Sequence, residues 1–326
     1  MNGPELDSHL DESDLAAGLR ADARAGLTAS PKQLPPKWFY DARGSELFEQ
    51  ITRLPEYYPT RAERAVLKVR AHEIARVTEA KTLIELGSGS SEKTRLLLDA
   101  LRTHGTLGAF VPFDVSEPAL RDAVAALTTE YPGLDVHGTV GDFTEHLAEL
   151  PEGSSRLVAF LGGTIGNLEP AQRERFFAEL RSALRAGEWF LLGADLVKDP
   201  AVLVPAYDDA AGVTAEFNRN VLHVLNRELG ADFDVDRFDH VALWDAEHEW
   251  IEMRLRARQA MRVHLAALQL TVEFAAGEEL RTEVSAKFRR AGLTWELARA
   301  GFALRRWWTD PDGRFSLSLA EAVPRS

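Results

Sequence analysis

Residues 82–94 read Thr82-Leu-Ile-Glu-Leu-Gly-Ser-Gly-Ser-Ser-Glu-Lys-Thr94, a short apolar run that leads into a glycine-rich turn. The apolar run is typical of a buried strand, and the residues from about 91 onward are expected to form a helix. Gly87 and Gly89 allow the backbone to turn tightly and to approach a ligand, while the helix N-terminus offers unpaired N–H groups. The stretch therefore predicts a nucleotide-like ligand site, and an ordinary strand, turn and helix is the alternative.

The same alternation of apolar and amphipathic segments continues on both sides of this turn. Strands are expected at 82–86, 109–113, 134–140, 156–162 and 188–196, and helices at 60–79, 91–103, 116–130 and 170–185. Continuous apolar strands that alternate with amphipathic helices indicate a parallel sheet covered on both faces.

Two acidic residues favour S-adenosylmethionine (SAM) over NAD as the ligand of the glycine turn. Glu92 occupies the third-glycine position of the dinucleotide-binding pattern GxGxxG, where its carboxylate would meet a pyrophosphate. Glu85 stands two residues before the first glycine, and we expect it to attract the amino group of SAM directly or through water. Lys93 is expected to pair with the carboxylate of SAM.

Acidic residues also follow the next two expected strands. Asp114 has the right chemistry to accept hydrogen bonds from both ribose hydroxyls, and Asp142 to accept one from the adenine amino group while Phe143 covers the base. Taken alone, each aspartate is more often a helix cap or a turn former. The carboxyl ends of parallel strands meet at one edge of the sheet, so the coincidence of these features favours a cofactor site there.

The rhythm changes after residue 195. A helix is expected at 12–29, an ordered surface segment or lid at 34–60, a helix at 213–230, alternating strands within 238–274, a helix at 288–300 and two strands at 302–310 and 314–322. A closing hairpin is how the sheet of a methyltransferase, unlike that of a dehydrogenase, usually ends. We predict an α/β fold in which residues 61–195 and 286–326 form a Rossmann-like class I methyltransferase core with a terminal antiparallel hairpin. Residues 1–60 and 196–285 are expected to form a second α+β substrate-binding lobe.

Composition excludes several classes of function. The 326 residues include 38 Lys and Arg against 51 Asp and Glu, and the net charge of -13 would repel nucleic acid. No run of about 18 apolar residues exists to span a bilayer, and the acidic start is unlike a signal peptide, so a cytoplasmic protein without membrane contact is expected. A monomer is also expected. With no cysteine and no HExxH pattern, no metal site is expected.

Five stretches together resemble the histidine-specific methyltransferases of ergothioneine biosynthesis. They are GLTASPKQLPPKWFYDARGSELFEQITRLPEYYPTRAE (26–63), IELGSGSSEKT (84–94), FLGGTIGNLEP (160–170), LVKDPAVLVPAYDDAAGVTAEFNRN (196–220) and FAAGEELRTEVSAKF (274–288). The similarity extends over nearly the whole chain. It implies three successive methyl transfers from SAM to the alpha-amino nitrogen of L-histidine, which give hercynine, the first step of ergothioneine biosynthesis.

The resemblance also implies roles for individual residues. The implied cofactor contacts are Gly87, Lys93, Asp114, Asp142 and Phe143, to which the residue patterns above add Glu85 and Gly89. The implied substrate contacts are Asn167 and Tyr207 at the amino-acid backbone, Tyr57, Glu283 and Ser285 at the imidazole, Met253 as a pocket wall and Tyr40 near the amine.

The residues themselves support a broader interpretation. Gly162 leaves a bare backbone beside the expected methyl group, and Asn167 offers a donor and an acceptor to a zwitterion, although a glycine turn with an Asn cap is the alternative. Glu283 and Ser285 share one face if their segment is a strand, whereas exposed polar positions are the alternative. The tyrosines at 40, 57 and 58 could equally be packing residues, and Asp208-Asp209 are expected at a solvated helix start.

Methyl transfer to an amine requires the neutral amine, and Tyr40 and Asn167 are the nearest candidates to relay its proton. Aromatic faces such as Tyr40, Phe48 and Phe143 suit the cationic product. Three alternatives stay open: an NAD-linked oxidoreductase, which Glu92 and the hairpin disfavour; a non-catalytic SAM-binding regulator; and an N-methyltransferase of another aromatic amino acid or amine such as tryptophan.

Overall fold

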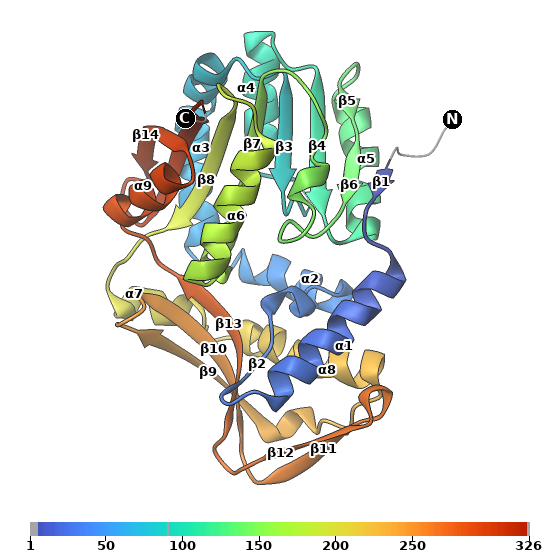
Figure 1. The fold of residues 1–326 in the computed structure, drawn as a ribbon. Coiled ribbons are helices and arrows are strands. Elements are labelled where there is room, and N and C mark those ends of the chain that lie inside the picture. The colour runs from blue at the N-terminus through green and yellow to red at the C-terminus, as the bar shows by residue number, and fades with distance from the viewer. Residues whose placement is uncertain (1–5, 90, 325–326) are drawn as a thin grey trace. The chain divides into compact units, whose positions relative to one another are not determined.

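The computed structural model describes residues 6–89 and 91–324, which divide into two compact units (Figure 1). The first unit comprises the described residues of Met1–Asp11, Pro59–Leu196 and Phe288–Ser326, and the second comprises Glu12–Tyr58 and Val197–Lys287. Each unit is therefore assembled from segments that are distant in the sequence.

A nine-stranded sheet forms the centre of the first unit, in the order β1-β6-β4-β3-β7-β8-β15-β14 with β5 beside β4. Its strands are β1 (Leu6–Ser8), β3 (Thr82–Leu86), β4 (Ala109–Asp114), β5 (Asp135–Val136), β6 (Gly138–Val140), β7 (Arg156–Phe160), β8 (Trp189–Asp195), β14 (Phe302–Thr309) and β15 (Phe315–Ala322). The strands from β1 to β8 pair in parallel, whereas β15 runs antiparallel to β8 and β14. The predicted Rossmann-like methyltransferase sheet with a terminal antiparallel hairpin is confirmed.

Helices cover both faces of this sheet because neighbouring strand residues point to opposite sides. They are α3 (Pro59–Thr78), α4 (Arg95–His104), α5 (Glu117–Glu130), α6 (Pro170–Ala183) and α9 (Arg290–Arg299), with short 3-10 turns η2 (Leu147–Glu149) and η3 (Thr164–Asn167). Apolar residues of α3, α4 and α5 pack with Leu157 and Leu191 in one core cluster. On the other face, Phe176 of α6 packs against Phe160 of β7, with ring centroids 5.0 Å apart.

Strand β1 differs from the prediction, which placed residues 1–60 entirely in the second lobe. It pairs in parallel with β6, where Leu6 lies opposite Gly138. A β-carbon at Gly138 would lie 2.4 Å from Leu6 Cδ2, so the glycine makes room for this edge strand. Three residues are too few to show a period-two pattern, and for this reason the sequence did not reveal the strand.

The second unit combines a four-stranded sheet, in the order β2-β13-β10-β9, with a separate hairpin of β11 and β12. Its strands are β2 (Lys32–Gln33), β9 (Phe238–Asp245), β10 (Trp250–Ala257), β11 (Met261–Leu265), β12 (Leu270–Phe274) and β13 (Glu279–Ala286). Its helices are α1 (Glu12–Thr28), α2 (Ala42–Ile51), α7 (Pro200–Leu203) and α8 (Val213–Leu229), with 3-10 turns η1 (Pro36–Phe39), η4 (Val204–Ala206), η5 (Val235–Arg237) and η6 (Ala266–Leu268).

Two sequence-based expectations about this unit can be compared with the structure. The segment 34–60, expected as an ordered surface segment or lid, is ordered and mixes exposed with buried residues; it buries Phe39, Leu47 and Ile51, and its helix α2 packs against α8. Asp209, expected at a solvated helix start, is buried and accepts hydrogen bonds from the backbone N–H groups of Val213 and Thr214 at 3.0 and 2.7 Å.

Among the described residues, none of the helices has the length and apolar character that a membrane span requires.

Candidate active site

The glycine turn after β3 leaves its backbone open at the carboxyl edge of the sheet. Gly87 and Gly89 have φ angles of 68° and 47°, in the left-handed region that favours glycine. A β-carbon built on Gly89 would meet no atom of the described residues within 4 Å, its chain neighbours aside. Helix α4 begins at Arg95 rather than at the predicted residue 91, because Ser91 still belongs to the turn and donates its N–H to the carbonyl of Ser88 at 2.8 Å.

Asp114, the last residue of β4, lies directly beside this turn. Its Oδ2 accepts the N–H of Gly89 at 3.0 Å, and its Oδ1 accepts the N–H of Ser116 at 3.1 Å. Burial raises the pKa of the Asp114 carboxyl above its ordinary value. Each carboxylate oxygen has two acceptor positions, so both oxygens can also accept a hydroxyl group of a ligand.

Phe143 and Asp142 follow β6 at the same edge. A β-carbon on Gly87 would lie 4.0 Å from Cε1 of Phe143, which places the phenyl ring next to the glycine turn. The ring packs edge-on against Phe160 at a centroid distance of 5.0 Å. Asp142 accepts hydrogen bonds through Oδ1 from the N–H and the hydroxyl of Thr144 at 2.8 and 2.6 Å, which is the geometry of a turn former.

Lys93 reaches a second point on this edge, at the loop after β7. Its ammonium forms an ion pair with Glu63 of α3, and the Glu63 oxygens also accept the backbone N–H of Gly162 at 2.9 and 3.0 Å. Gly162 has a φ of 81° and is followed by the 3-10 turn that ends at Asn167. The described residues of the first unit thus bring Lys93 and Gly162 together through a carboxylate that the sequence did not single out.

Glu85 lies in the strand rather than on the open turn. Its side chain is buried, and Thr94 donates its hydroxyl to Oε1. No side chain or backbone group among the described residues makes a hydrogen bond to the buried Oε2 atom, and burial raises the pKa of the carboxyl to about 7. A buried oxygen of this kind would be stabilised by a hydrogen-bond donor, and the amino group of SAM, directly or through water, is one such donor.

A hydrogen-bonded triangle forms the polar centre of the second unit. Lys287 donates through Nζ to the hydroxyls of Tyr207 and Ser285 at 2.8 and 2.9 Å, and these two hydroxyls lie 2.8 Å apart. All three side chains are buried. The carbonyl of Tyr207 also accepts a hydrogen bond from Nε2 of His240 at 2.8 Å, which fixes its backbone.

Glu283 and Ser285 share one face of β13, as the sequence predicts for a strand. Met253 of β10 lies directly opposite Glu283, and Ile251 opposite Ser285, so all four side chains belong to the same face of the sheet. Met253 is almost fully buried, whereas Glu283 is partly exposed. A carboxylate and a hydroxyl therefore stand beside an apolar wall.

A chain of aromatic rings continues from Tyr207 in the same unit. The ring centroid of Tyr57 lies 6.3 Å from that of Tyr207 and 6.2 Å from that of Phe48, and both contacts are edge-on. Tyr40 meets Phe48 and Phe217 edge-on at 5.5 Å in each case. Tyr40 is 40% exposed, so a ligand can reach this ring from solvent.

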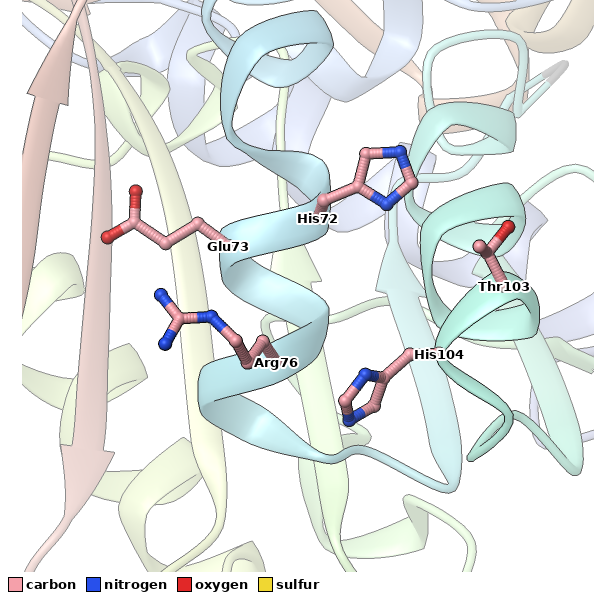
Figure 2. Close-up of a pocket in the computed structure, with 5 residues that line it drawn as sticks. All are labelled: His72, Glu73, Arg76, Thr103 and His104. Carbon is pink, nitrogen blue, oxygen red and sulfur yellow. The ribbon is translucent and has the colours of Figure 1, made fainter.

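The hollow drawn in Figure 2 is a different feature. It lies between α3 and the end of α4 and is lined by His72, Glu73, Arg76, Thr103 and His104. These positions are near the ends of the two helices that precede β3 and β4, whereas ligands of parallel sheets bind at the carboxyl ends of the strands. None of the site residues predicted from the sequence lines this hollow.

Two residues of these arrangements escaped the sequence-based prediction. Glu63 lies on the same helical stripe as Val66, Leu67 and Ile74, so the periodicity already indicated a buried carboxylate. Lys287 follows Ser285 by two residues, just after β13, and continues the polar alternation of that strand, which could have pointed to the same face.

The residues of the first unit fit SAM. This ligand is a nucleoside with an amino-acid tail, and it is suited by a glycine turn with open backbone, a carboxylate, an aromatic ring and a lysine.

Similarity to known proteins covers nearly the whole chain. The family described as "Histidine-specific methyltransferase, SAM-dependent" matches residues 19–322. A "Histidine N-alpha-methyltransferase" of Mycolicibacterium smegmatis is 59% identical over 97% of this chain and 98% of its own length. The protein of the same name from Mycobacterium tuberculosis is 58% identical over 96% and 98%. "Ergothioneine biosynthesis protein 1" of Neurospora crassa is 34% identical over 61% of this chain and 23% of its own length.

Proposed function

The chain belongs to the histidine-specific, SAM-dependent methyltransferases, and we propose that it methylates the alpha-amino nitrogen of L-histidine three times to give hercynine. The observation that carries this proposal is the identity of 59% and 58% to two histidine N-alpha-methyltransferases over essentially their full lengths. The fungal relative named for ergothioneine biosynthesis, of which this chain matches 23%, supports a role in that biosynthesis, and we place the chain at its first step.

The first unit is proposed to hold SAM along the carboxyl edge of its sheet. Gly87 and Gly89 let the ligand approach the backbone, and Asp114 accepts hydrogen bonds from the ribose hydroxyls. Phe143 covers the adenine ring, and Asp142 accepts a hydrogen bond from the adenine amino group. Lys93 pairs with the carboxylate of the amino-acid tail. Glu85 is proposed to act on the tail's amino group through water, because its own side chain is buried within β3.

The second unit is proposed to recognise histidine. Glu283 and Ser285 share a face with the apolar wall of Met253, so they can satisfy the two ring nitrogens of an imidazole while its carbon edge meets methionine. Tyr57 adds a hydroxyl at the imidazole, and the buried hydroxyl of Tyr207 serves the amino-acid backbone. A site that offers both a carboxylate and a hydroxyl rejects aromatic side chains without ring nitrogens, because its polar groups would be left unpaired.

Bound SAM supplies an electrophilic methyl group, which the amine nitrogen takes as the carbon–sulfur bond breaks and the amine proton passes to solvent. Alignment supplies most of the rate in such a displacement. Gly162 presents bare backbone and Asn167 a donor and an acceptor for this alignment. Tyr40 is proposed to lie near the amine, where its ring stabilises the growing positive charge.

Incubation of the purified protein with SAM and each of the twenty amino acids, followed by mass measurement, tests this function. Histidine alone should gain one, two and then three methyl groups. Methylation of tryptophan in preference to histidine would establish the alternative substrate, and binding of SAM without turnover of any amino acid would favour a regulator.

A further inference from the structure

Glu63 is a fully buried carboxylate at the carboxyl edge of the sheet in the first unit. Its exposed fraction is 0%, and its two oxygens accept the N–H of Gly162 at 2.9 and 3.0 Å. The ammonium of Lys93 pairs with Oε2. One side chain of α3 therefore joins the glycine turn after β3 to the loop after β7.

The surrounding strands are shaped to admit this carboxylate. A β-carbon on Gly193 of β8 would lie 2.0 Å from Glu63 Oε1, so any other residue there would displace the side chain. A β-carbon on Gly162 would lie 3.8 Å from Nζ of Lys93, which places the ammonium beside bare backbone. The Lys93 side chain is still 21% exposed, whereas Glu63 is fully buried, so of the two ionic side chains Lys93 is the one open to a ligand.

We propose that Glu63 is a positioning residue for the amino-acid tail of SAM, because it fixes the Lys93 ammonium and the Gly162 backbone in the arrangement that receives the tail's carboxylate. The inference rests on the proposed use of SAM as methyl donor. Glu63 itself is inaccessible and acts through Lys93. A lysine that is already immobilised does not lose its side-chain entropy when the ligand binds.

The charge of Glu63 does not by itself decide the sign of this effect. It repels the carboxylate of the tail but attracts the ammonium of the same tail, so the two contributions oppose each other. The loss of a fixed geometry then dominates. In Glu63→Gln, the amide offers one oxygen in place of two. An oxygen at the Oε2 position can still accept from both Lys93 and Gly162, but the amide N–H₂ then lies against the Gly162 N–H and the ionic partner of Lys93 is gone.

The competing interpretation is that Glu63 merely attaches α3 to the sheet. Such a role would change stability but would weaken every adenosine ligand by the same factor. A positioning role is specific to ligands that carry the tail. S-adenosylhomocysteine carries the amino-acid tail and 5′-methylthioadenosine lacks it, so this pair separates the two interpretations.

Calorimetric titration of the full-length protein with both ligands provides the test. For Glu63→Gln we expect S-adenosylhomocysteine to bind roughly ten- to thirtyfold more weakly, the cost of again immobilising a lysine, while 5′-methylthioadenosine binds as it does to wild type. Lys93→Met should show the same selective loss, and the double variant should lose little more than either single one. Glu63→Asp retains the charge and should recover part of the affinity.

Glu188→Gln is the matched control. Glu188 is also buried and ion-paired, to Arg156 at 2.6 Å, but it lies at the opposite edge of the sheet where β7 and β8 begin. Its substitution should lower stability and leave both titrations unchanged. Equal losses for the two ligands in Glu63→Gln, tighter binding of S-adenosylhomocysteine, or additive effects of Glu63 and Lys93 would each overturn the proposal. Failure of the wild type to bind S-adenosylhomocysteine would instead refute the proposed function, and the inference with it.

Discussion

The ammonium of Lys287 lies 2.8 Å from the hydroxyl oxygen of Tyr207, and both side chains are buried in the second unit. Ser285 receives a second hydrogen bond from the same ammonium, at 2.9 Å. A buried positive charge polarises hydroxyls to which it donates and makes them better donors to an anion. The Tyr207 hydroxyl, which we place at the amino-acid backbone, is therefore suited to the carboxylate of an amino-acid substrate, while Ser285 holds it in place from the imidazole side.

Lys287→Met should weaken histidine binding while leaving S-adenosylhomocysteine binding unchanged. The loss should be about 1–3 kcal/mol, because two buried hydroxyls lose a charged partner. Calorimetry with each ligand measures it. Lys198→Met is the matched control, since Lys198 donates to the Tyr58 hydroxyl at 2.6 Å in the same unit but outside the triangle. Equal losses in the two variants would show that Lys287 only supports the fold.

Asp114→Ala should weaken SAM and S-adenosylhomocysteine binding far more than histidine binding. Charge-assisted hydrogen bonds to the ribose hydroxyls are worth about 1.5–3 kcal/mol. Since 5′-methylthioadenosine keeps the ribose, it should weaken by the same factor, in contrast to the tail-specific effect expected for Glu63. Exposed Asp135 on β5 offers a control, and Asp135→Ala should change no affinity. Comparable losses of cofactor and histidine in Asp114→Ala would make Asp114 a structural residue.

Glu283→Ala should lower the preference for histidine over tryptophan. A buried imidazole N–H without its acceptor costs about 1–3 kcal/mol, and the vacated space beside Met253 admits a larger ring. The readout is the ratio of kcat/KM for the two amino acids, together with an unchanged affinity for SAM. Glu279→Ala, on the same strand but paired with Arg256 at 2.8 Å, controls for damage to β13. An unaltered ratio would remove Glu283 from imidazole recognition.

Glu85→Gln should become more stable relative to wild type as the pH rises. Burial raises the pKa of Glu85 from 4.5 to about 7, so the folded protein holds this proton more tightly than the unfolded chain does. Wild type therefore loses stability between about pH 4.5 and 7, by roughly 3 kcal/mol at most, and the amide does not. Urea unfolding at pH 5 and pH 8 measures the difference.

Glu188→Gln is expected to show the opposite sign, and to show it at lower pH. Burial raises the pKa of Glu188, but hydrogen bonds from Arg156 and Arg185 lower it overall, so this carboxylate stabilises the fold above its unfolded pKa. The variant should lose stability relative to wild type as the pH rises toward 4.5, and the difference should then stay constant between pH 5 and pH 8. Parallel pH profiles of Glu85→Gln and wild type would contradict the raised pKa.

The sequence predicted the parts of the fold that have a strong period. The alternation of apolar and amphipathic segments located the parallel strands, and the turn Pro311-Asp312-Gly313 located the closing hairpin. The glycine turn and Asp114 could be placed at one edge because parallel strands end there, and the structure links them by the hydrogen bond from Gly89 to Asp114. The substrate roles came from resemblance and stay predictions.

What the sequence did not predict depends on contacts between distant segments. Strand β1 is too short to show a pattern and exists because Gly138 leaves space for Leu6. The link from Glu63 to Gly162 joins residues 99 positions apart, and Lys287 reaches Tyr207 across 80. No local spacing encodes such pairs, although burial of a charge on an apolar stripe or strand indicates that a partner is needed.

The position and number of the transferred methyl groups test the central claim most directly. Wild-type protein should be incubated with L-histidine and SAM labelled in its methyl group, and the product fragmented in a tandem mass spectrometer. The account predicts trimethylated histidine with all three labelled methyl groups on the alpha nitrogen. A labelled methyl group on the imidazole, or no transfer to histidine by protein that binds S-adenosylhomocysteine, would contradict it.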